Sequence, residues 1–499
     1  MPKDAPLLRR PVLRRRRLQV DDVNVVDRSM MKKAVGGTVV GNTMEWFDIG
    51  VYGYLAVTMG AVFLSEADAS AQLIFSLGVF AATFLARPLG GIVFGRIGDR
   101  IGRQKTLATT LMLMAGSTFV IGLLPGYDQI GMWAPVLLVL MKLIQGFSTG
   151  GEYAGATTFV TEYASDKRRG YLSSILDLGS YLGFALGAAV VSVMQLTLSA
   201  ETMLDWGWRI PFLIAGPLGL IAIYFRLKIE ESPAFQATLD AQEQNAASDN
   251  PDAESAPPGT VAMVRRYWRP IVVAMVLVSA ANTVGYTLTS YMPSYLTDSK
   301  GYDAVHGTLL TIPVLVLMAL CIPLCGKLSD RIGRRPVLLM GAGATIVLAI
   351  PAFLLIGLGP VWSTLLGLVL LAVPVTLYVS NLASALPALF TTASRYGAMG
   401  ISYNFAVAIF GGTAPLIMQG LINLSGNDMM PAFWLMATSV AGAVAVFNMR
   451  ESANRPMPGS MPSVDTKAEA HELVATQDEN PLLDVDSLPF GSEGVPAGR

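Results

Sequence analysis

The chain has 499 residues, of which 53% are hydrophobic and 14% charged, and its mean hydropathy is +0.51. Soluble proteins usually carry about 25% charged residues, so this composition excludes a soluble globular protein and indicates a polytopic membrane protein. The 35 Lys plus Arg and 36 Asp plus Glu give a net charge of −1, which does not suggest a nucleic-acid partner.

The chain opens with a basic segment, residues 1–33, that contains four consecutive arginines but no long apolar core. We expect a cytoplasmic extension here and not a cleaved signal peptide. Twelve apolar runs that are long enough to cross a bilayer follow. They occupy about residues 34–63, 71–94, 106–124, 133–158, 171–198, 210–227, 270–296, 307–327, 336–357, 361–389, 396–424 and 430–449. The predicted fold is all-α and polytopic, with twelve transmembrane helices in two six-helix bundles, residues 34–227 and 270–449.

Two hydrophilic regions lie outside the bundles. Residues 228–269 turn to Gln, Asn, Asp, Ser and Pro, and residues 450–499 are rich in Pro, Ser, Gly and acidic residues. Neither region has enough apolar surface to fold alone, so we predict a linker between the halves and a disordered, acidic tail.

Lys and Arg are concentrated on one side of the predicted membrane. Of the 35, Arg209 and Lys300 fall in segments expected outside, and Arg87 and Lys142 fall within spans. Because basic loops are retained in the cytoplasm during insertion, both termini and the linker are predicted to be cytoplasmic. The expected location is the plasma membrane, which in a bacterium is the inner membrane, with the lipid bilayer as a partner.

The first span carries two acids within the stretch GGTVVGNTMEWFDIGVYGY. If this helix enters the bilayer near residue 34, Glu45 lies about 17 Å along it, near the middle of a hydrocarbon core of about 30 Å. At 100° per residue, Glu45, Asp48 and Tyr52 share one face of the helix. An ionisable group at that depth costs about 2.5–3.5 kcal/mol to insert, which favours a functional role over a pair that only holds helices together.

The two halves repeat a loop. GRIGDRIGRQK after the second helix and GKLSDRIGRRP after the eighth share a glycine, an Asp-Arg pair and a Gly-Arg pair at matched offsets. An ordinary positively charged loop explains the arginines but not the matched acids. The residues predicted to form a gate are Gly95, Asp99, Arg100, Gly102 and Arg103 in the first loop and Gly326, Asp330, Arg331, Gly333 and Arg334 in the second. Duplicated six-helix halves are typical of transporters.

These motifs resemble those of the major facilitator superfamily. Both GxxxDRxGR loops match its signature, and KLIQG at residues 142–146 resembles its fourth-helix motif, with Lys142 where Arg is usual. GNTMEWFDIGVYGY, RPLGGIVFGRIGDRIGRQK, QGFSTGGEYAGA, DWGWRIPF and EESPAF together resemble the metabolite:proton symporter family, especially its osmoregulatory permeases for proline and glycine betaine. The likeness runs from about residue 23 to about residue 456, and the tail departs from it, with Pro and Gly where some of these permeases have a coiled coil.

This resemblance implies a proton symporter, not an enzyme, that imports a small zwitterionic osmolyte such as proline or glycine betaine. It also implies alternating access, with the first, fourth, seventh and tenth helices around the site. Glu45 or Asp48 is expected to bind the coupled proton, because burial disfavours the charged carboxylate. Aromatic rings would hold the cation of the substrate and basic side chains its carboxylate. The candidate substrate-binding residues are Trp46, Tyr52, Arg87, Lys142, Glu152, Tyr153, Tyr286, Tyr378 and Asn381.

Several of these residues have a simpler interpretation. Any one of the aromatic rings could pack in the core or face lipid without touching substrate. Arg87 precedes Pro88 and could brace a helix break against Glu45 or Asp48. Asp177 lies among glycines of the fifth helix, so close helix contact is expected first, with pairing to a basic group of the other half or locally.

The gate makes a specific geometric prediction. Asp330 is expected to accept backbone amides at the start of the fifth helix near Gly170, and Asp99 those at the start of the eleventh near Arg395. Such contacts would close the cytoplasmic side while the outside is open.

Other functions stay open. The same family contains carriers of di- and tricarboxylates such as α-ketoglutarate and citrate, so a proton symporter for these is the main alternative. A non-transporting membrane sensor is the second, and an intramembrane enzyme lacks HExxH, GxSxG and phosphate-binding motifs. No cofactor, metal ion or obligate protein partner is expected. Cys321 and Cys325 have no His or carboxylate near them in the sequence, so we interpret them as buried packing residues.

Overall fold

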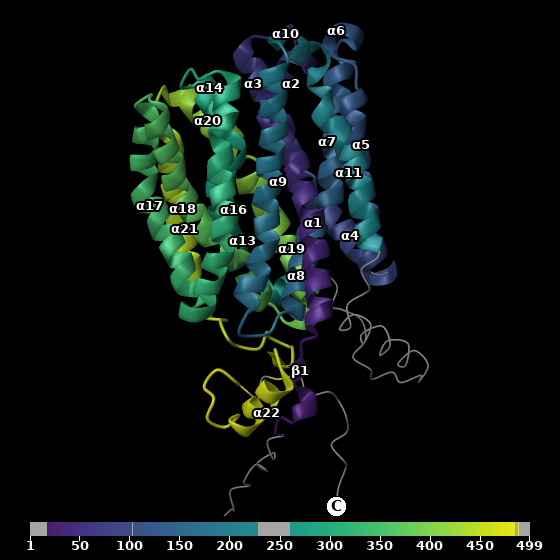
Figure 1. The fold of residues 1–499 in the computed structure, drawn as a ribbon, viewed down its shortest axis with the longest axis vertical. Coiled ribbons are helices and arrows are strands. Elements are labelled where there is room, and N and C mark those ends of the chain that lie inside the picture. Colours follow the sequence, from purple (N-terminus) through teal and green to yellow (C-terminus); the bar gives the residue numbers. More distant parts are fainter. Residues whose placement is uncertain (1–16, 102, 228–259, 485–487, 489–499) are drawn as a thin grey trace, which may run out of the picture.

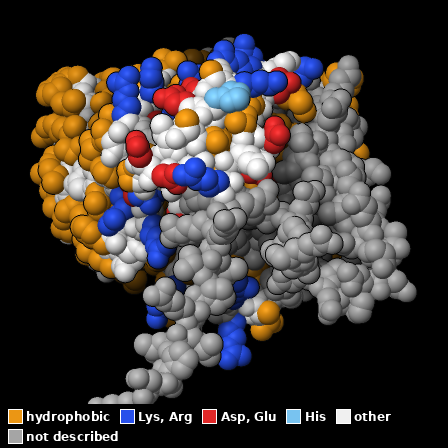
Figure 2. All heavy atoms as spheres, turned by 90° about the horizontal axis from the view of Figure 1, so that it is seen from below, with side chains coloured by type: hydrophobic (Ala, Val, Ile, Leu, Met, Phe, Trp, Pro, Cys, Tyr) orange, Lys and Arg blue, Asp and Glu red, His pale blue; other side chains and the backbone are white. Residues whose placement is uncertain are grey.

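The structure is a computed structural model that describes residues 17–101, 103–227, 260–484 and 488. Long helices run along the longest axis of the molecule, and the two terminal segments meet at one end (Figure 1). We call this the tail end and the opposite one the loop end. Seen from the tail end, Lys and Arg gather around the visible face, whereas the flank beside it is hydrophobic (Figure 2). This distribution is that of a protein whose flank meets lipid and whose tail end meets water.

The first half consists of eleven labelled α-helices and one π-helical turn. They are α1 (Arg28–Tyr54), α2 (Ala56–Phe63), α3 (Ala69–Leu85), α4 (Arg87–Ile101), α5 (Arg103–Leu123), α6 (Tyr127–Ile130), α7 (Trp133–Thr149), α8 (Glu152–Tyr163), α9 (Arg169–Thr197), α10 (Ala200–Thr202), η2 (Met203–Gly207) and α11 (Arg209–Leu227). Asp27 accepts the backbone N–H groups of Ser29 and Met30, which explains why α1 begins there.

The second half repeats this arrangement with two π-helical turns, η3 and η5, and one 3₁₀ turn, η4. Its elements are α13 (Thr260–Tyr286), η3 (Thr287–Tyr291), α14 (Met292–Asp298), α15 (Ala304–Leu309), α16 (Thr311–Ile332), α17 (Arg334–Gly357), α18 (Val361–Ala385), η4 (Pro387–Leu389), α19 (Thr392–Ala406), η5 (Val407–Gly411), α20 (Ala414–Ser425) and α21 (Met430–Phe447). Each of the twelve predicted spans coincides with one or more helices of the two halves.

Nine helices within the described ranges are long and apolar enough to cross a membrane by length and composition. A tenth crossing is the pair α1 and α2, which is bent by 63°. The shorter apolar helices Ala108–Leu123 and Arg209–Ile221 occupy the third and sixth predicted spans. Several spans are therefore broken rather than straight, and the breaks supply irregular backbone next to the interior of the protein.

Close packing of small residues brings the first-half helices together. A Cβ on Gly146 of α7 would lie 1.7 Å from the carbonyl oxygen of Thr83 on α3, a distance that excludes every other residue. This contact packs α3 against α7. It thereby brings α4, which follows α3 and carries Arg87, close to α7, which carries Lys142. Helix α9 packs against α1 of its own half and against α16 and α18 of the other half, so it lies between the halves (Figure 1).

The predicted disorder of the tail is wrong for residues 450–484. They contain β2 (Ser463–Val464) and α22 (Lys467–Ala475), and β2 pairs in parallel with β1 (Asn24–Val25) near the start of the chain. With the turn η1 (Val20–Asp22), these elements form what we call the tail module. Its apolar cluster consists of Leu18, Val23, Val464, Ala470, Leu483 and Leu488. The cluster draws on segments more than 400 residues apart, so neither segment by itself shows enough apolar surface to predict folding.

The linker also ends earlier than predicted. Helix α13 begins at Thr260 rather than at residue 270, and it bends at Tyr267, three residues before Pro270. Met263 is buried in this first part of α13, where it lies against Gly397 of α19. Contact with another helix, which a window of linker composition cannot reveal, orders these residues. Residues 228–259 lie outside the described part of the chain.

Candidate functional site

Glu45 and Asp48 both lie in the interior, with relative exposures of 0% and 2%. Their predicted face of α1 points inward, because Asn42 and Tyr52 on the same stripe are buried as well. The two acids have different neighbours, however, so they are described separately.

Glu45 forms an ion pair with Arg87. Arg87 Nη2 lies 3.3 Å from Glu45 Oε1, and both side chains are buried. The guanidinium also lies over two aromatic rings, with its carbon 4.4 Å from the centroid of Phe84 and 5.9 Å from that of Trp46. Arg87 is the first residue of α4, immediately after the break that follows α3. The bracing contact with Glu45 is therefore present, and Arg87 Nε has no hydrogen-bond partner among the described residues.

Asp48 ends a chain of hydrogen bonds that starts at Lys142. Lys142 Nζ donates to Gln145 Oε1 at 2.6 Å, and Gln145 Nε2 donates to Thr118 Oγ1 at 2.8 Å. Thr118 Oγ1 in turn donates to Asp48 Oδ2 at 3.1 Å. The Lys142 ammonium also lies 4.2 Å from the ring centroid of Tyr52. Asp48 thus contacts a neutral hydroxyl, and its Oδ1 has no hydrogen-bond partner among the described residues.

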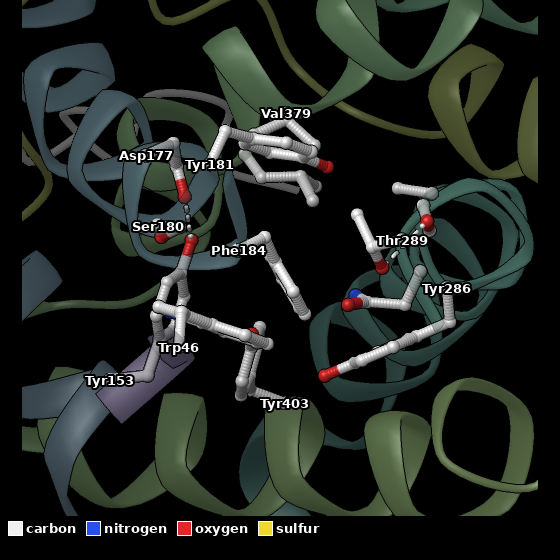
Figure 3. Close-up of a pocket in the computed structure, with 14 residues that line it drawn as sticks. Trp46, Tyr153, Asp177, Ser180, Tyr181, Phe184, Tyr286, Thr289, Val379 and Tyr403 are labelled. Carbon is white, nitrogen blue, oxygen red and sulfur yellow. Dashed lines mark hydrogen bonds between the residues drawn. The ribbon is translucent and has the colours of Figure 1, made fainter. Parts of the chain in front are cut away.

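A pocket with an empty volume of about 450 Å³ lies next to these acids, between the two halves (Figure 3). Six aromatic side chains line it, namely Trp46, Tyr153, Tyr181, Phe184, Tyr286 and Tyr403. Four polar side chains join them, namely Asp177, Ser180, Asn282 and Thr289. Both halves contribute side chains to this pocket, as alternating access requires.

The aromatic rings hold one another in place. Trp46 lies 5.3 Å from Phe184 and 6.0 Å from Tyr286 between ring centroids, and Tyr153 stacks on Tyr403 at 4.2 Å. Trp46 comes from α1 and Tyr286 from the end of α13, so this contact crosses between the halves. The π-helical turn η3 follows Tyr286 directly, and such turns are frequent at functional sites.

Trp46 and Asn42 connect the pocket wall to α9. Trp46 Nε1 donates to Asn42 Oδ1 at 3.1 Å. Asn42 Nδ2 donates to the Leu176 carbonyl at 2.9 Å and to Ser180 Oγ at 2.5 Å. The orientation of the indole ring is therefore fixed by α9, and Asp177 follows Leu176 on that helix.

The structure brings three of the nine predicted substrate-binding residues to this pocket, namely Trp46, Tyr153 and Tyr286. Arg87, Lys142 and Tyr52 lie in the ionic clusters behind it, and Glu152 is buried at the start of α8.

Tyr378 and Asn381 do not line the pocket, and Val379 and Leu382 of the same helix do. Asn381 Nδ2 donates to the carbonyl of Leu377 at 3.0 Å, within α18 itself. Neighbouring residues of a helix point about 100° apart, so Tyr378 and Asn381 face away from the pocket that Val379 and Leu382 line. The sequence therefore identified the correct helix but not the side that it turns to the pocket.

Sequence reasoning missed several pocket residues. Tyr181, Phe184 and Ser180 belong to the fifth helix, which the predicted set of lining helices omitted. Tyr403 belongs to the eleventh helix. Thr118 of the third helix, also missed, does not line the pocket but contacts Asp48. A threonine or an aromatic ring in an apolar helix has no distinguishing local pattern, so only three-dimensional proximity identifies these residues.

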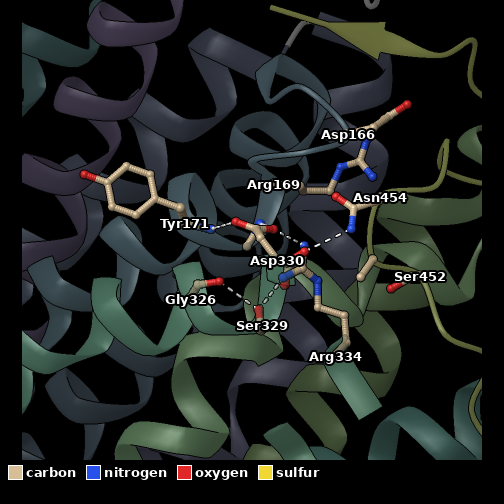
Figure 4. A network of polar contacts seen from close by, with 12 residues as sticks. Asp166, Arg169, Tyr171, Gly326, Ser329, Asp330, Arg334, Ser452 and Asn454 are labelled. Carbon is tan, nitrogen blue, oxygen red and sulfur yellow. Dashed lines mark hydrogen bonds and ion pairs between the residues drawn. The ribbon is translucent and has the colours of Figure 1, made fainter. Parts of the chain in front are cut away.

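A second ionic cluster lies at the tail end (Figure 4). Asp330, near the end of α16, accepts the N–H groups of Gly170 at 2.9 Å and of Tyr171 at 2.8 Å. Arg334 Nη2 donates to Asp330 Oδ1 at 2.6 Å. The cap residue of α9 provides no side-chain cap of its own, so a carboxylate of the second half satisfies the first amides of a first-half helix. The contact predicted between Asp330 and the amide of Gly170 is present.

The geometry of the second loop explains why glycine occupies positions 326 and 333. A Cβ on Gly326 would lie 2.3 Å from Ser174 Oγ across the interface of the halves, and Gly333 has a φ of +107°. The Arg331 side chain is exposed and takes no part in the network. The structure does not describe how the side chains predicted for the gate in the first loop are placed, namely those at Gly95, Asp99, Arg100, Gly102 and Arg103.

The tail crosses this interface. Arg169 Nη1 donates to the carbonyl of Arg455 at 3.0 Å, and Arg395 Nη2 donates to that of Pro458 at 2.9 Å. Arg395 Nη1 also donates to Glu162 Oε1 at 3.0 Å. Since Arg169 begins a first-half helix and Arg395 lies in the first turn of a second-half helix, a single segment of tail binds both halves.

The family described as sugar (and other) transporter matches residues 35–459. The chain belongs to this transporter family of the major facilitator superfamily. The transporter is 50% identical to the ectoine/proline transporter ProP of Corynebacterium glutamicum over 96% of this chain and 95% of that protein. It is 44% identical to the proline/betaine transporter of Escherichia coli (strain K12) over 96% of this chain and 95% of that protein.

Other comparisons agree. The transporter is 43% identical to the glycine betaine/proline/ectoine/pipecolic acid transporter OusA of Dickeya dadantii, over 94% of this chain and 93% of that one. Its fold is similar to that of the proton:xylose symporter XylE, with a TM-score of 0.68 at 18% identity, over 86% of this chain and 98% of that one. The predictions of an all-α polytopic membrane fold and of a transporter rather than an enzyme are confirmed.

Proposed function

We propose that the protein is a proton-coupled symporter that imports a small zwitterionic osmolyte, such as proline or glycine betaine, by alternating access. The compounds after which the relatives are named share a cationic nitrogen and a carboxylate group. The observation that carries the proposal is the aromatic pocket between the halves. Electron-rich ring faces attract a cation that is too bulky or too well shielded for a strong ion pair, a quaternary ammonium above all.

The carboxylate of the substrate would bind Arg87. Its guanidinium lies over the Trp46 ring, at the edge of the pocket, and its Nε has no hydrogen-bond partner among the described residues. Pairing with Glu45 keeps the guanidinium in place without using all of its five donors. The substrate would thus lie with its cation among the rings and its carboxylate toward α4.

Asp48 is the better candidate for the coupled proton. Glu45 has a permanent cation beside it, since Arg87 does not lose its proton in proteins. Asp48 instead contacts the neutral hydroxyl of Thr118, and the Lys142 ammonium attracts it without touching it, through a chain of hydrogen bonds that passes Gln145 and Thr118. A buried carboxyl group with neutral contacts accepts a proton most readily.

The two bundles, residues 34–227 and 270–449, are proposed to rock about the pocket while the tail-end cluster of Asp330 serves as the gate. Each time the bundles separate at the tail end, Asp330 has to release the amides of α9. The tail end is proposed to face the cytoplasm of a bacterial cell, because basic residues gather there.

Uptake by purified protein in liposomes tests the proposal. Wild-type protein should accumulate radiolabelled proline or glycine betaine against a gradient when a proton gradient is imposed. For one proton, 100 mV of membrane potential supplies about 2.3 kcal/mol, which supports roughly fiftyfold accumulation. Asp48→Asn should abolish accumulation and retain exchange of labelled for unlabelled substrate, and the exposed Asp205→Asn should behave as wild type.

Two results would contradict the proposal. Full coupling in Asp48→Asn would exclude Asp48 as the proton site. Accumulation of α-ketoglutarate or citrate, with no competition by proline or glycine betaine, would favour the carboxylate symporter instead.

A further inference from the structure

Asp177 is an acid of the pocket to which neither the proton pathway nor the gate assigns a role. It lies on α9, is 4% exposed and lines the pocket beside the aromatic rings (Figure 3). The Tyr153 hydroxyl donates to Asp177 Oδ1 over a long 3.5 Å. Asp177 Oδ2 has no hydrogen-bond partner among the described residues.

Asp177 differs from the other two buried acids in the side chains that it contacts. Glu45 is paired with Arg87, and Asp48 is linked to Lys142 through two side chains. Within the described residues, no Lys, Arg or His forms an ion pair with Asp177, so the pairing that the sequence left open beside close helix contact is absent there. Burial without a cation favours the neutral acid, whereas a ligand that brings a positive charge stabilises the carboxylate, so this wall of the pocket favours a cationic ligand.

The rings around Asp177 suit the same ligand. Tyr153 donates to it and stacks on Tyr403, and Tyr181 stands four residues further along the same helix. Ring faces and a carboxylate attract a cationic nitrogen together, the rings by their quadrupoles and the acid by its charge. The same acid repels a substrate that carries a second carboxylate.

We infer that Asp177 binds the cationic nitrogen of the substrate and is the residue that selects zwitterions over di- and tricarboxylates. This inference rests on the proposed function, because it assigns one end of the proposed substrate to one wall of the pocket. It also supplies a physical reason why the carboxylate alternative is disfavoured: an anion at this wall would meet an acid and, among the described residues, no basic side chain that could bind it.

A matched pair of ligands tests the contact. 3,3-Dimethylbutanoate has the shape of glycine betaine with a neutral carbon in place of the quaternary nitrogen. Binding of each compound to the purified transporter is measured by calorimetry for wild type, Asp177→Asn, Asp177→Glu and the exposed control Asp205→Asn. The ratio of the two dissociation constants isolates the contribution of the positive charge.

We expect wild type and Asp205→Asn to prefer glycine betaine strongly. Asp177→Asn should reduce this preference about ten- to a hundredfold, the size of one charge-assisted contact, by weakening glycine betaine and leaving 3,3-dimethylbutanoate unchanged or tighter. Asp177→Glu keeps the charge and should keep most of the preference. If Asp177→Asn does not fold, the smaller neutral variant Asp177→Ser takes its place.

An unchanged preference in Asp177→Asn would overturn the inference, as would an equal loss of affinity for both ligands, which indicates a purely structural role. An intact preference combined with loss of proton-driven accumulation would identify Asp177 as a proton carrier instead and would also overturn it. Failure of wild type to bind either glycine betaine or proline would contradict the proposed function itself, so the two failures are distinguishable.

Discussion

The protein buries ionic side chains in two regions, which differ in how completely the polar atoms of these side chains are hydrogen-bonded. At the tail end, both carboxylate oxygens of Asp330 accept backbone N–H groups, and Arg334 pairs with the same acid. In the central region, Asp48 Oδ1, Arg87 Nε and Asp177 Oδ2 have no hydrogen-bond partner among the described residues.

This difference is informative because most buried polar atoms in proteins are satisfied. A network in which every polar atom has a hydrogen-bond partner stabilises one conformation. A network with unpaired polar atoms leaves those atoms able to bind a ligand or a proton. We therefore interpret the tail-end cluster as the proposed latch and the central cluster as the proposed binding site, although both combine acidic and basic side chains.

Loss of Arg87 should have the largest effect on stability. Arg87→Met removes the cation paired with Glu45 and leaves a buried negative charge, which should cost about 3–5 kcal/mol of unfolding free energy. Thermal unfolding of the detergent-purified protein measures it. Arg87→Met combined with Glu45→Gln removes both charges and should recover part of the loss. A double variant no more stable than Arg87→Met would show that the ion pair is not the cause.

Neutralising Asp330 should open the latch. Asp330→Asn weakens the capping of α9 and the pairing with Arg334, and two charge-assisted contacts are together worth about 3 kcal/mol or more. A cysteine introduced at Ser174, which lies against Gly326 of the other half, should then react faster with a thiol reagent in a background lacking Cys321 and Cys325. The exposed control Arg331→Gln should leave its reactivity unchanged. Equal reactivity in Asp330→Asn would contradict the latch.

Trp46→Leu should weaken substrate binding about tenfold by removing a ring face from the pocket, since a desolvated cation–π contact is worth about 1–2 kcal/mol. Calorimetric titration with glycine betaine measures this change. Trp206→Leu, at a half-exposed position in η2, is the matched control and should bind as wild type. Unchanged affinity in Trp46→Leu would place the substrate elsewhere.

Glu451 allows a smaller test, based on pH. Partial burial raises the pKa of Glu451, because it disfavours the charged carboxylate. Hydrogen bonds from four backbone N–H groups together have the larger, opposite effect and hold the pKa below its usual 4.5. These groups belong to Arg334, Ala453, Arg335 and Ser452. Because the folded pKa is lowered, the stabilisation is present above the unfolded pKa and is lost as the pH falls through the folded one.

Glu451→Gln should therefore lower stability by about 1 kcal/mol at pH 7, as for the loss of a helix cap, and by less as the pH falls below 4.5. Thermal unfolding as a function of pH measures this. The exposed Glu472→Gln on α22 is the control and should show no such dependence. A difference from wild type that stays constant across this pH range would contradict the assignment.

Much of the fold could be predicted because a bilayer imposes strong rules on sequence. Runs of apolar residues located the spans, and the matched loops at Asp99 and Asp330 revealed the duplication. The tail module could not be predicted in the same way, because β1 and β2 stabilise each other only when the two ends of the chain meet.

The candidate site was predictable in part. Trp46, Tyr153 and Tyr286 stood out because they lie near polar residues in apolar helices, and they do line the pocket. Asp177 was noticed, but the sequence could not show that no basic side chain of the described ranges pairs with it, because pairing depends on every helix that packs around it.

Composition and periodicity by themselves determined that this chain spans a membrane in two related halves and that α1 buries Glu45 and Asp48. These properties follow from transfer free energies and helical geometry, which are local to a segment. Only the tertiary structure decided that Arg87 pairs with Glu45, that Asp330 caps a helix of the other half, and that Asp177 faces an aromatic pocket with no basic partner among the described residues. Those outcomes depend on distances between helices far apart in sequence, and the energy of a charge in the interior is set by such distances.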